Sequence, residues 1–180
     1  SEISDFGKGS VTGDGNHYLR KFWEMFEPLS IGKYWLNSPD SGMYSGRSEV
    51  VLWDQGSFDP TVELGFAHRG QRVYGKKGIT IGKAGNFRFT PYTGELFDDN
   101  TAVLCPDDAR LISGLWEYCV SGQLQIDISK LDKKMSVTAG TFTKVYFDSD
   151  SWETAANVNF PKGLPCPYSD DPTQWIFHGH

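Results

Sequence analysis

Basic side chains are concentrated in one part of this 180-residue chain. Arginine and lysine occur six times between Leu64 and Gly94, where neither aspartate nor glutamate occurs. The other 11 basic residues share the rest of the chain with all 23 acidic ones, so the net charge of −6 conceals a strongly basic stretch. Because phosphate attraction depends on local charge, this stretch could bind nucleic acid. A solvated loop surface without a partner explains the same charges equally well.

The segment Gly70–Lys77 nearly matches the phosphate-binding loop of nucleotide hydrolases. The last position of that motif is the serine or threonine that holds Mg²⁺, and this chain has Lys77 there. The following residues, Gly78–Ile81, alternate like a strand, whereas the motif requires a helix whose N-terminus faces the phosphates. We therefore do not expect nucleotide hydrolysis.

No other set of residues forms a recognisable catalytic centre or metal site. His17 and His68 each stand alone, and His178 with His180 would supply only two ligands of a metal site. The nucleophile motif G-x-S-x-G is absent. The cysteines show no C-x-x-C spacing, so we expect neither a disulfide nor a zinc site but free thiols in a cytoplasmic protein. The three are Cys105, Cys119 and Cys166.

Four helices are predicted from caps, breakers and apolar spacing. The first runs from Asn16 to Glu27, between a cap at Asp14 and Pro28, and its buried face would hold Leu19, Phe22, Trp23 and Phe26. The others are a helix that Asp107 or Asp108 caps and Ser121-Gly122 ends, a helix marked by Leu124, Ile128 and Leu131, and a short one from Ser151 to Val158.

Short β-favouring segments separated by glycines predict strands and hairpins. We expect turns from Gly32 to Ser48, and an irregular chain from Phe160 onward. The fold class is therefore α+β, with a small, irregular, mostly antiparallel sheet, hairpins and packed helices. The predicted strands are Glu49–Trp53, Leu64–Ala67, Arg72–Tyr74, Ile79–Ile81, Phe87–Thr90, Thr101–Leu104 and Thr141–Phe147.

Several phrases of the sequence resemble phrases of large N6-adenine DNA methyltransferases. The resemblance covers nearly the whole chain and is most specific in its second half. Gly15 separates Asp14 from Asn16, which the family has adjacent, and Cys166 replaces an acidic residue of the family pattern. The matching phrases are Gly9–Asp14 with Tyr18-Leu19-Arg20 and Phe22-Trp23-Glu24, Tyr44-Ser45-Gly46 before Val50–Trp53, Arg69-Gly70 before Val73–Ile79, Tyr92-Thr93-Gly94, Val137-Thr138 with Phe142 and Lys144, Gly163-Leu164-Pro165, Tyr168–Trp175 and Phe177–His180.

The family that these phrases resemble includes type IIG restriction-modification enzymes and related phage-defence methyltransferases. The resemblance implies a target-recognition domain similar to those of type I specificity subunits, in which an irregular sheet and hairpins meet DNA and a helical lobe packs behind. The parent enzyme would hold AdoMet in a Rossmann-like domain. Neither N-P-P-Y, D-P-P-Y nor a glycine-rich cofactor loop occurs here, so we expect a fragment without catalytic residues or a cofactor of its own.

On this interpretation the chain has three parts. They are an N-terminal arm with a helix (1–48), the target-recognition domain (49–160) and a proline-rich extension (161–180). The expected partners are double-stranded DNA and the methyltransferase catalytic domain of the same parent chain. No membrane is expected as a partner, because no apolar run reaches the ~18 residues that span a bilayer.

The basic stretch supplies the candidate DNA contacts. Lysine and arginine would neutralise phosphates, which positions the domain without reading the sequence. Bases would be read in the major groove by arginine on guanine and by asparagine or glutamine on adenine. The acidic segment Glu95–Asp108 would face solvent or the other domains. The candidates are Arg69, Gln71, Arg72, Asn86 and Arg88 for bases, and Lys76, Lys77, Lys83, Lys130, Lys133, Lys134 and Lys144 for phosphates.

The rival interpretation is a carbohydrate-binding or protein-interaction module. Six tryptophans and 20 glycines in an acidic chain would suit a β domain that stacks on sugars. Trp35 and Trp53, at predicted loops or strand ends, are the candidates for stacking, while core packing explains them as well. A third interpretation is a piece that only packs against the catalytic domain.

Overall fold

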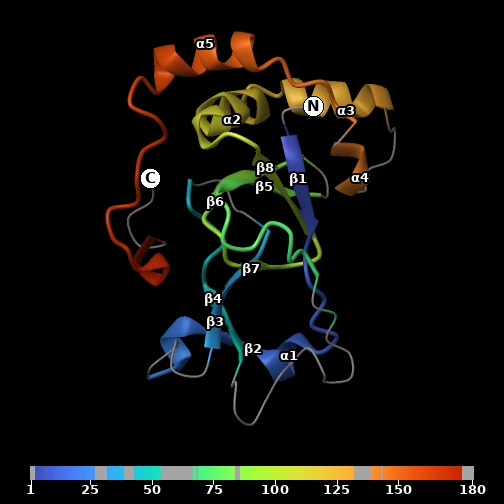
Figure 1. The fold of residues 1–180 in the computed structure, drawn as a ribbon. Helices are drawn as coiled ribbons and strands as arrows, with labels where there is room; N and C mark the ends of the chain where they lie inside the picture. The colour runs from blue at the N-terminus through green and yellow to red at the C-terminus, as the bar shows by residue number, and fades with distance from the viewer. Residues whose placement is uncertain are drawn as a thin grey trace.

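A computed structural model describes residues 3–26, 32–38, 43–53, 67, 69–83, 86–131, 139–142 and 144–175. Figure 1 shows three tiers, with helices at the top, one sheet in the middle and a second sheet below. The predicted α+β class is confirmed. The strands are divided between two four-stranded, mostly antiparallel sheets instead of forming a single one.

The middle sheet is antiparallel throughout and has the strand order β1-β8-β5-β6. Alternate side chains of a strand point to opposite faces. Ala102 and Leu104 of β8 therefore join the core on the helical side, whereas Val103 and Cys105 join a second apolar cluster on the other face. Both faces of this sheet are buried. Its strands are β1 (Ile3–Lys8), β5 (Gly78–Gly82), β6 (Phe89–Tyr92) and β8 (Thr101–Pro106).

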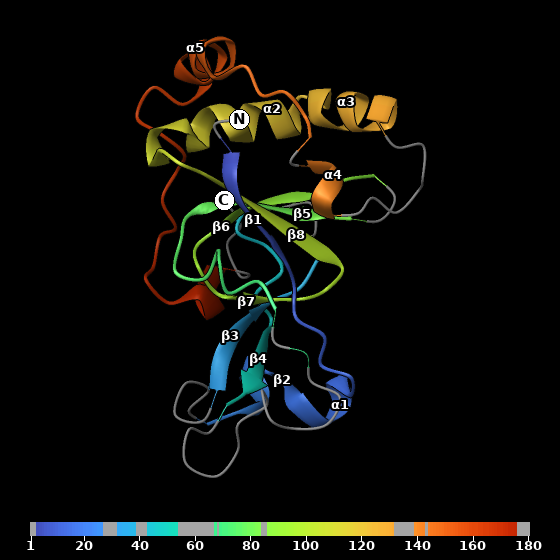
Figure 2. The ribbon, with the colours of Figure 1, turned by 45° about the vertical axis from the view of Figure 1, so that its right-hand side comes forward.

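A helical layer covers one face of the middle sheet (Figure 2). The apolar faces of α2 and α3 share one core with Ile79 and Ile81 of β5. Helix α5 lies on α2 at Gly114, where a Cβ would come within 3.1 Å of the backbone nitrogen of Glu153. Glycine at this position thus allows the two helices to pack closely. The layer consists of α2 (Ile112–Val120), α3 (Gln123–Leu131), α4 (Ala139–Phe142) and α5 (Ser149–Asn159).

The lower sheet has the strand order β2-β4-β3-β7. Its last pair is parallel, with Trp35 of β3 opposite Leu96 of β7. The Trp35 side chain is fully buried beside Tyr18 and Val51, so core packing is its role. Phe97 continues from β7 into the cluster beneath the middle sheet and thereby joins the two sheets. The strands are β2 (Leu19–Lys21), β3 (Gly32–Leu36), β4 (Glu49–Leu52) and β7 (Leu96–Phe97).

After α5 the chain runs down the side of the molecule towards the level of β7 (Figure 1). We call residues 160–175 the C-terminal strap. The Tyr44 hydroxyl donates a hydrogen bond of 2.7 Å to the carbonyl of Pro165, and the Tyr44 ring meets the ring of Trp175 edge-on. The Tyr34 hydroxyl donates to Asp171 at 3.1 Å. Burial and the nearby Asp171 carboxylate raise the pKa of Tyr34 to about 12. The strap thus links the helical layer to the lower sheet.

A buried ion pair stands where the strap meets the two sheets. Arg47 Nη2 lies 2.6 Å from Glu95 Oε1, and the two side chains are 1% and 7% exposed. The guanidinium also donates to the carbonyls of Pro91 (2.7 Å) and Ser45 (3.1 Å). Its central carbon lies 5.0 Å from the centre of the Trp175 ring. One arginine therefore holds β6, the loop after it and the strap together.

The first predicted helix is wrong. Asp14 does cap a helix, through its side chain and the N–H of His17, but α1 (Gly15–Tyr18) lasts a single turn. Residues 19–21 then form β2, which pairs with β4. A short isolated helix is marginal in water, so burial against a neighbouring strand decides the conformation. The side chains of Trp23 and Phe26, expected on a buried face, are 57% and 100% exposed.

Two predicted strands are also wrong, and the strands β1, β3 and β7 were not predicted. In place of the predicted strand Arg72–Tyr74, residues 71–75 form a turn, and the glycine before it (Gly70) and the one at its end (Gly75) have positive φ angles of 83° and 73°. In place of the predicted strand Thr141–Phe147, residues 141–142 belong to α4 and residues 144–147 have no strand structure, and Phe142, Val145 and Phe147 join the core of the helical layer. Strand β3 lies in a segment expected to be turns.

The remaining elements agree with the sequence. The strands near Glu49, Ile79, Phe89 and Thr101 are present, as are the three later helices. Asp108 caps a 3-10 helix (Ala109–Leu111) that leads directly into the first of these helices, through the N–H of Arg110 (2.9 Å). The predicted strand Leu64–Ala67 lies outside the described residues, apart from a single bridge at Ala67. Residues 1–48 supply strands to both sheets, and the division of the chain into three parts stays a prediction.

All three cysteines are free, as expected, and they differ sharply in environment. Cys105 and Cys119 are buried, and Cys166 is exposed on the strap. Burial raises the pKa of Cys105 to about 12 and raises the pKa of Cys119 as well. At pH 8 a thiol with that pKa is ionised in about one molecule in ten thousand, against about a quarter for an ordinary cysteine.

We therefore expect one fast-reacting thiol in the folded protein. Titration with a chromogenic disulfide reagent at pH 8 should modify Cys166 within minutes, and the other two only after denaturation. Cys166→Ser should abolish the fast phase. A fast phase that accounts for two or three thiols would contradict the burial of Cys105 and Cys119.

Candidate nucleic-acid interface

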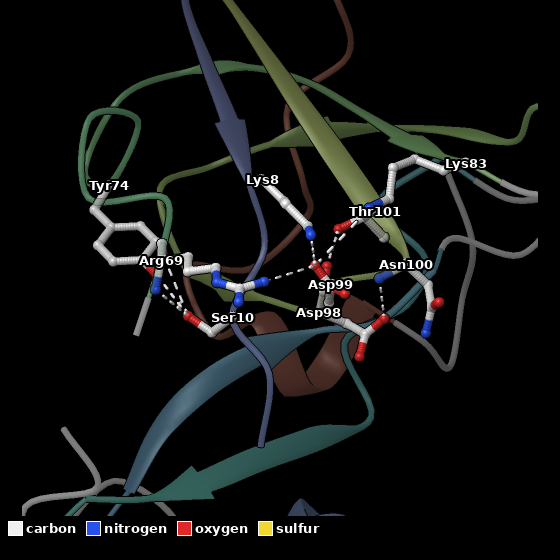
Figure 3. A network of polar contacts seen from close by, with 9 residues as sticks. All are labelled: Lys8, Ser10, Arg69, Tyr74, Lys83, Asp98, Asp99, Asn100 and Thr101. Atoms are coloured by element: carbon white, nitrogen blue, oxygen red, sulfur yellow. Dashed lines mark hydrogen bonds and ion pairs between the residues drawn. The ribbon is translucent and has the colours of Figure 1, made fainter. Parts of the chain in front are cut away.

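Three basic side chains meet around the carboxylate of Asp99 (Figure 3). The distances to Asp99 Oδ1 are 3.2 Å from Lys8 Nζ, 3.7 Å from Arg69 Nη1 and 4.0 Å from Lys83 Nζ. We call these four residues the Asp99 cluster. Even when the neighbouring Asp98 is included, positive charge exceeds negative charge here, which suits the binding of an anion.

Strand pairing brings two of the cations together. Lys8 is the last residue of β1 and lies opposite Ala102 of β8. Lys83 follows β5, and its backbone N–H donates to the carbonyl of Asn100 (2.9 Å) in the turn before β8. Asp98 holds this turn by accepting from the N–H of Asn100 at 2.7 Å. Asp99 thus lies near the ends of β1 and β5, the two strands that flank β8.

Arg69 is positioned through its backbone, which leaves its side chain available. The N–H of Arg69 donates to the hydroxyl of Ser10 (2.9 Å), and the hydroxyl of Tyr74 donates to the Arg69 carbonyl. Ser10 is itself fully buried and held by the carbonyl of Phe97 (2.8 Å). Next to Ser10, a Cβ on Gly9 would lie 1.9 Å from the carbonyl oxygen of Asp98, so only glycine fits.

Lys83 is more deeply buried than the other two cations of the Asp99 cluster. Its side chain is only 12% exposed, whereas the side chains of Lys8 and Arg69 are 47% and 44% exposed. Burial lowers the pKa of Lys83 and outweighs the opposite effect of Asp99. Lys8 and Arg69 are therefore the members of the cluster best placed to contact a phosphate directly.

The predicted DNA-binding residues divide between the two ends of β5. Arg88 lies beside Lys83, because its carbonyl accepts from the N–H of Gly82 (2.9 Å), and Asn86 is exposed in the same hairpin. Lys77 stands before β5, about 20 Å from Lys83 at 3.3 Å per residue. Lys76, next to it, forms an ion pair with Asp5. Gln71 and Arg72 are exposed in the turn beneath the sheet.

The structure does not bring the later lysines to this surface. Lys130 is on α3 and forms an i,i+3 ion pair with Asp127 at 2.8 Å. Lys144 is exposed just after α4. Both belong to the helical layer, which covers the face of the middle sheet opposite the 71–75 turn. Lys133 and Lys134 lie outside the described residues.

Sequence reasoning missed Lys8, Ser10 and Asp99. The segment around Lys8 has no strong β pattern, and its partner strand is about 100 residues away along the chain, so no local signal marks it. The expectation that Glu95–Asp108 faces solvent is wrong in part. Glu95 is buried against Arg47, and Asp99 faces the basic cluster. The basic stretch Leu64–Gly94 contains no acidic residue, so the carboxylates that pair with it come from other segments of the sequence.

Among residues that the structure describes, no three histidine, cysteine, aspartate or glutamate side chains converge as a metal site. His68, His178 and His180 are outside that part of the chain. None of the described helices is both long and apolar enough to cross a bilayer. A scan of protein-family models finds no match to the chain, and a search of curated proteins finds none either.

Proposed function

We propose that this chain recognises the DNA target of an N6-adenine methyltransferase or restriction-modification enzyme. The observation that carries the proposal is the convergence of Lys8, Arg69 and Lys83, from three separate segments, at one end of the middle sheet. A basic surface of this kind binds phosphates without regard to sequence. The resemblance of the sequence phrases to this enzyme family supports the same function.

The positions of the basic and amide side chains suggest which of them would contact phosphates and which would contact bases. Phosphates of one strand would meet Lys8, Arg69 and Arg88 at the end of the middle sheet. Asn86 in the β5–β6 hairpin and Gln71 and Arg72 in the 71–75 turn are exposed and carry the side chains that read base edges. The distance of about 20 Å along β5 matches about six base pairs at 3.4 Å each. Chemistry, AdoMet and the adenine pocket would belong to the catalytic domain.

The test is the salt dependence of binding to a labelled DNA duplex, followed by fluorescence anisotropy. Contacts from Lys8, Arg69 and Arg88 to three phosphates would give a slope of about −2.7 for log affinity against log salt. Arg69→Ala should weaken binding about tenfold, since a hydrogen bond to a charged group contributes ~1.5 kcal/mol. The slope should become shallower by about 0.9.

Lys144→Ala is the matched control, because Lys144 is an exposed lysine on the helical side of the molecule. This variant should bind DNA as the parent protein does. The DNA proposal fails if the chain shows no binding at low salt, or if its binding is independent of salt. It also fails at this surface if Arg69→Ala and Lys144→Ala have equal effects.

Trp35 and Trp53, the tryptophans expected to stack on sugars, give the carbohydrate alternative no support, although Trp23 is 57% exposed. Trp35 is fully buried, and Trp116 and Trp175 are nearly so. Trp53 is partly buried, and Lys33 Nζ lies 4.0 Å from the centre of its ring. Stacking on a sugar requires an open aromatic face. The rings of Trp35 and Trp53 are occupied by protein atoms instead.

A further inference from the structure

A cavity of about 350 Å³ lies beneath the C-terminal strap. Its floor is formed by the beginning of β5 and the end of β6, and its side by the start of α2. This volume falls within the range of small-molecule sites, which begins near 300 Å³. The cavity is at the opposite end of β5 from the Asp99 cluster, so it is separate from the proposed DNA surface. The apolar residues of its wall are Pro91, Tyr92, Ile112, Leu164 and Pro167.

The walls of the cavity are held in place by contacts that need no ligand. Tyr92 is 1% exposed, and its hydroxyl donates to the carbonyl of Glu95 at 2.6 Å. Tyr44 donates to the carbonyl of Pro165 in the strap, which forms the roof. The partly buried side chains of Ile112, Leu164 and Pro167 give the cavity an apolar lining that suits the ring of an aromatic ligand.

Two cations stand at the rim of this apolar space. Lys77 makes no hydrogen bond or ion pair with any residue in the described ranges of the chain. The Arg110 side chain is 88% exposed, and it uses Nε and Nη2 on a single carboxylate oxygen of Asp108. The Nη1 group of Arg110 keeps its donors for another acceptor. A ligand that filled the apolar space could therefore place an anionic group between Lys77 and Arg110.

We propose that this cavity binds a small aromatic anion, a planar ring that carries one carboxylate or phosphate group. The ring lies against Leu164 and Pro167, which are only partly buried, and the anion is bound by Lys77 and Arg110. Such a site resembles other ligand pockets in having mostly apolar walls and a few polar groups that fix the orientation. Cys166 lines the same cavity and gives a chemical handle on its occupancy.

A fluorescent dye tests the site directly. Anilinonaphthalene sulfonate is an aromatic anion, and N-phenylnaphthylamine has the same rings without the charge. We expect the anionic dye to bind the native protein at least about tenfold more tightly than the neutral dye. Arg110→Gln and Lys77→Gln should each remove most of this difference. Lys144→Gln, which changes a lysine outside the cavity, should leave it intact. Alkylation of Cys166 with a maleimide should block the anionic dye.

Two displacement experiments distinguish the sources of the anion. Displacement of the dye by adenosine monophosphate would indicate a phosphate ligand, and displacement by indole acetate would indicate a carboxylate. The proposal is overturned if the dye binds equally well to Arg110→Gln, Lys77→Gln and the alkylated protein. It is also overturned if neither competitor displaces the dye at millimolar concentration. Because Arg110 is not among the proposed DNA contacts, Arg110→Gln separates this site from DNA binding.

Discussion

Glu95→Ala will lower the free energy of unfolding by about 3–5 kcal/mol, the largest change we expect from a single substitution. It leaves the guanidinium of Arg47 buried without its counter-ion, because that side chain is 1% exposed and cannot reach water. Burial already lowers the pKa of Arg47, against the stabilising effect of Glu95. Urea denaturation at neutral pH, followed by tryptophan fluorescence, measures the loss.

A double substitution and a surface pair provide the controls. Arg47→Met with Glu95→Ala should recover much of the stability, since replacing both partners leaves no buried charge. Lys76→Gln breaks the exposed ion pair with Asp5 and should leave the urea midpoint almost unchanged, because solvent screens exposed ion pairs. If Glu95→Ala were as mild as Lys76→Gln, the buried ion pair would not be what joins β6, its following loop and the strap.

The second large effect concerns DNA binding and rests on the proposed function. Asp99→Asn should raise the affinity for a DNA duplex about tenfold at low salt, because each charge-assisted contact contributes ~1.5 kcal/mol. The substitution keeps the size of the side chain and removes the negative charge that Lys8, Arg69 and Lys83 now face. Anisotropy titrations at several salt concentrations should also show a slope steeper by about 0.9.

Asp107→Asn is the matched control for Asp99→Asn. Asp107 is an exposed aspartate at the opposite end of β8, so its replacement makes the same change in net charge away from the cluster. If both variants gained affinity equally, total charge would explain the gain. If Asp99→Asn gained none, the carboxylate would not be competing with phosphate for these cations.

The parts of the fold that sequence patterns predicted are those whose signal is local. Strand β8 combines β-favouring residues with burial on both faces, and α2 has an apolar face and follows a 3-10 turn that Asp108 caps. The basic stretch around Arg69 and Lys83 was likewise visible as composition. In each case the decisive residues are close together in the sequence.

The predictions that failed concern segments whose structure depends on partners far away in the sequence. The 19–21 segment has the spacing of a helix, but pairing with β4 makes it a strand. The cluster around Asp99 needs β1 beside β8, and neither Lys8 nor Asp99 carries a motif that indicates the other. The acidic partner of the basic stretch was therefore invisible until the strands were in place.

The pairing of β1 with β8 also has a consequence for synthesis on the ribosome. Lys8 pairs with Ala102 in the sheet. At 5–20 residues per second, the ribosome adds Ala102 about 5–20 s after Lys8. The middle sheet therefore cannot be completed until about 100 residues after Lys8 have been synthesised. Long-range pairing of this kind is slow even in the free chain. During that interval the β1 segment is without its partner and is open to molecular chaperones.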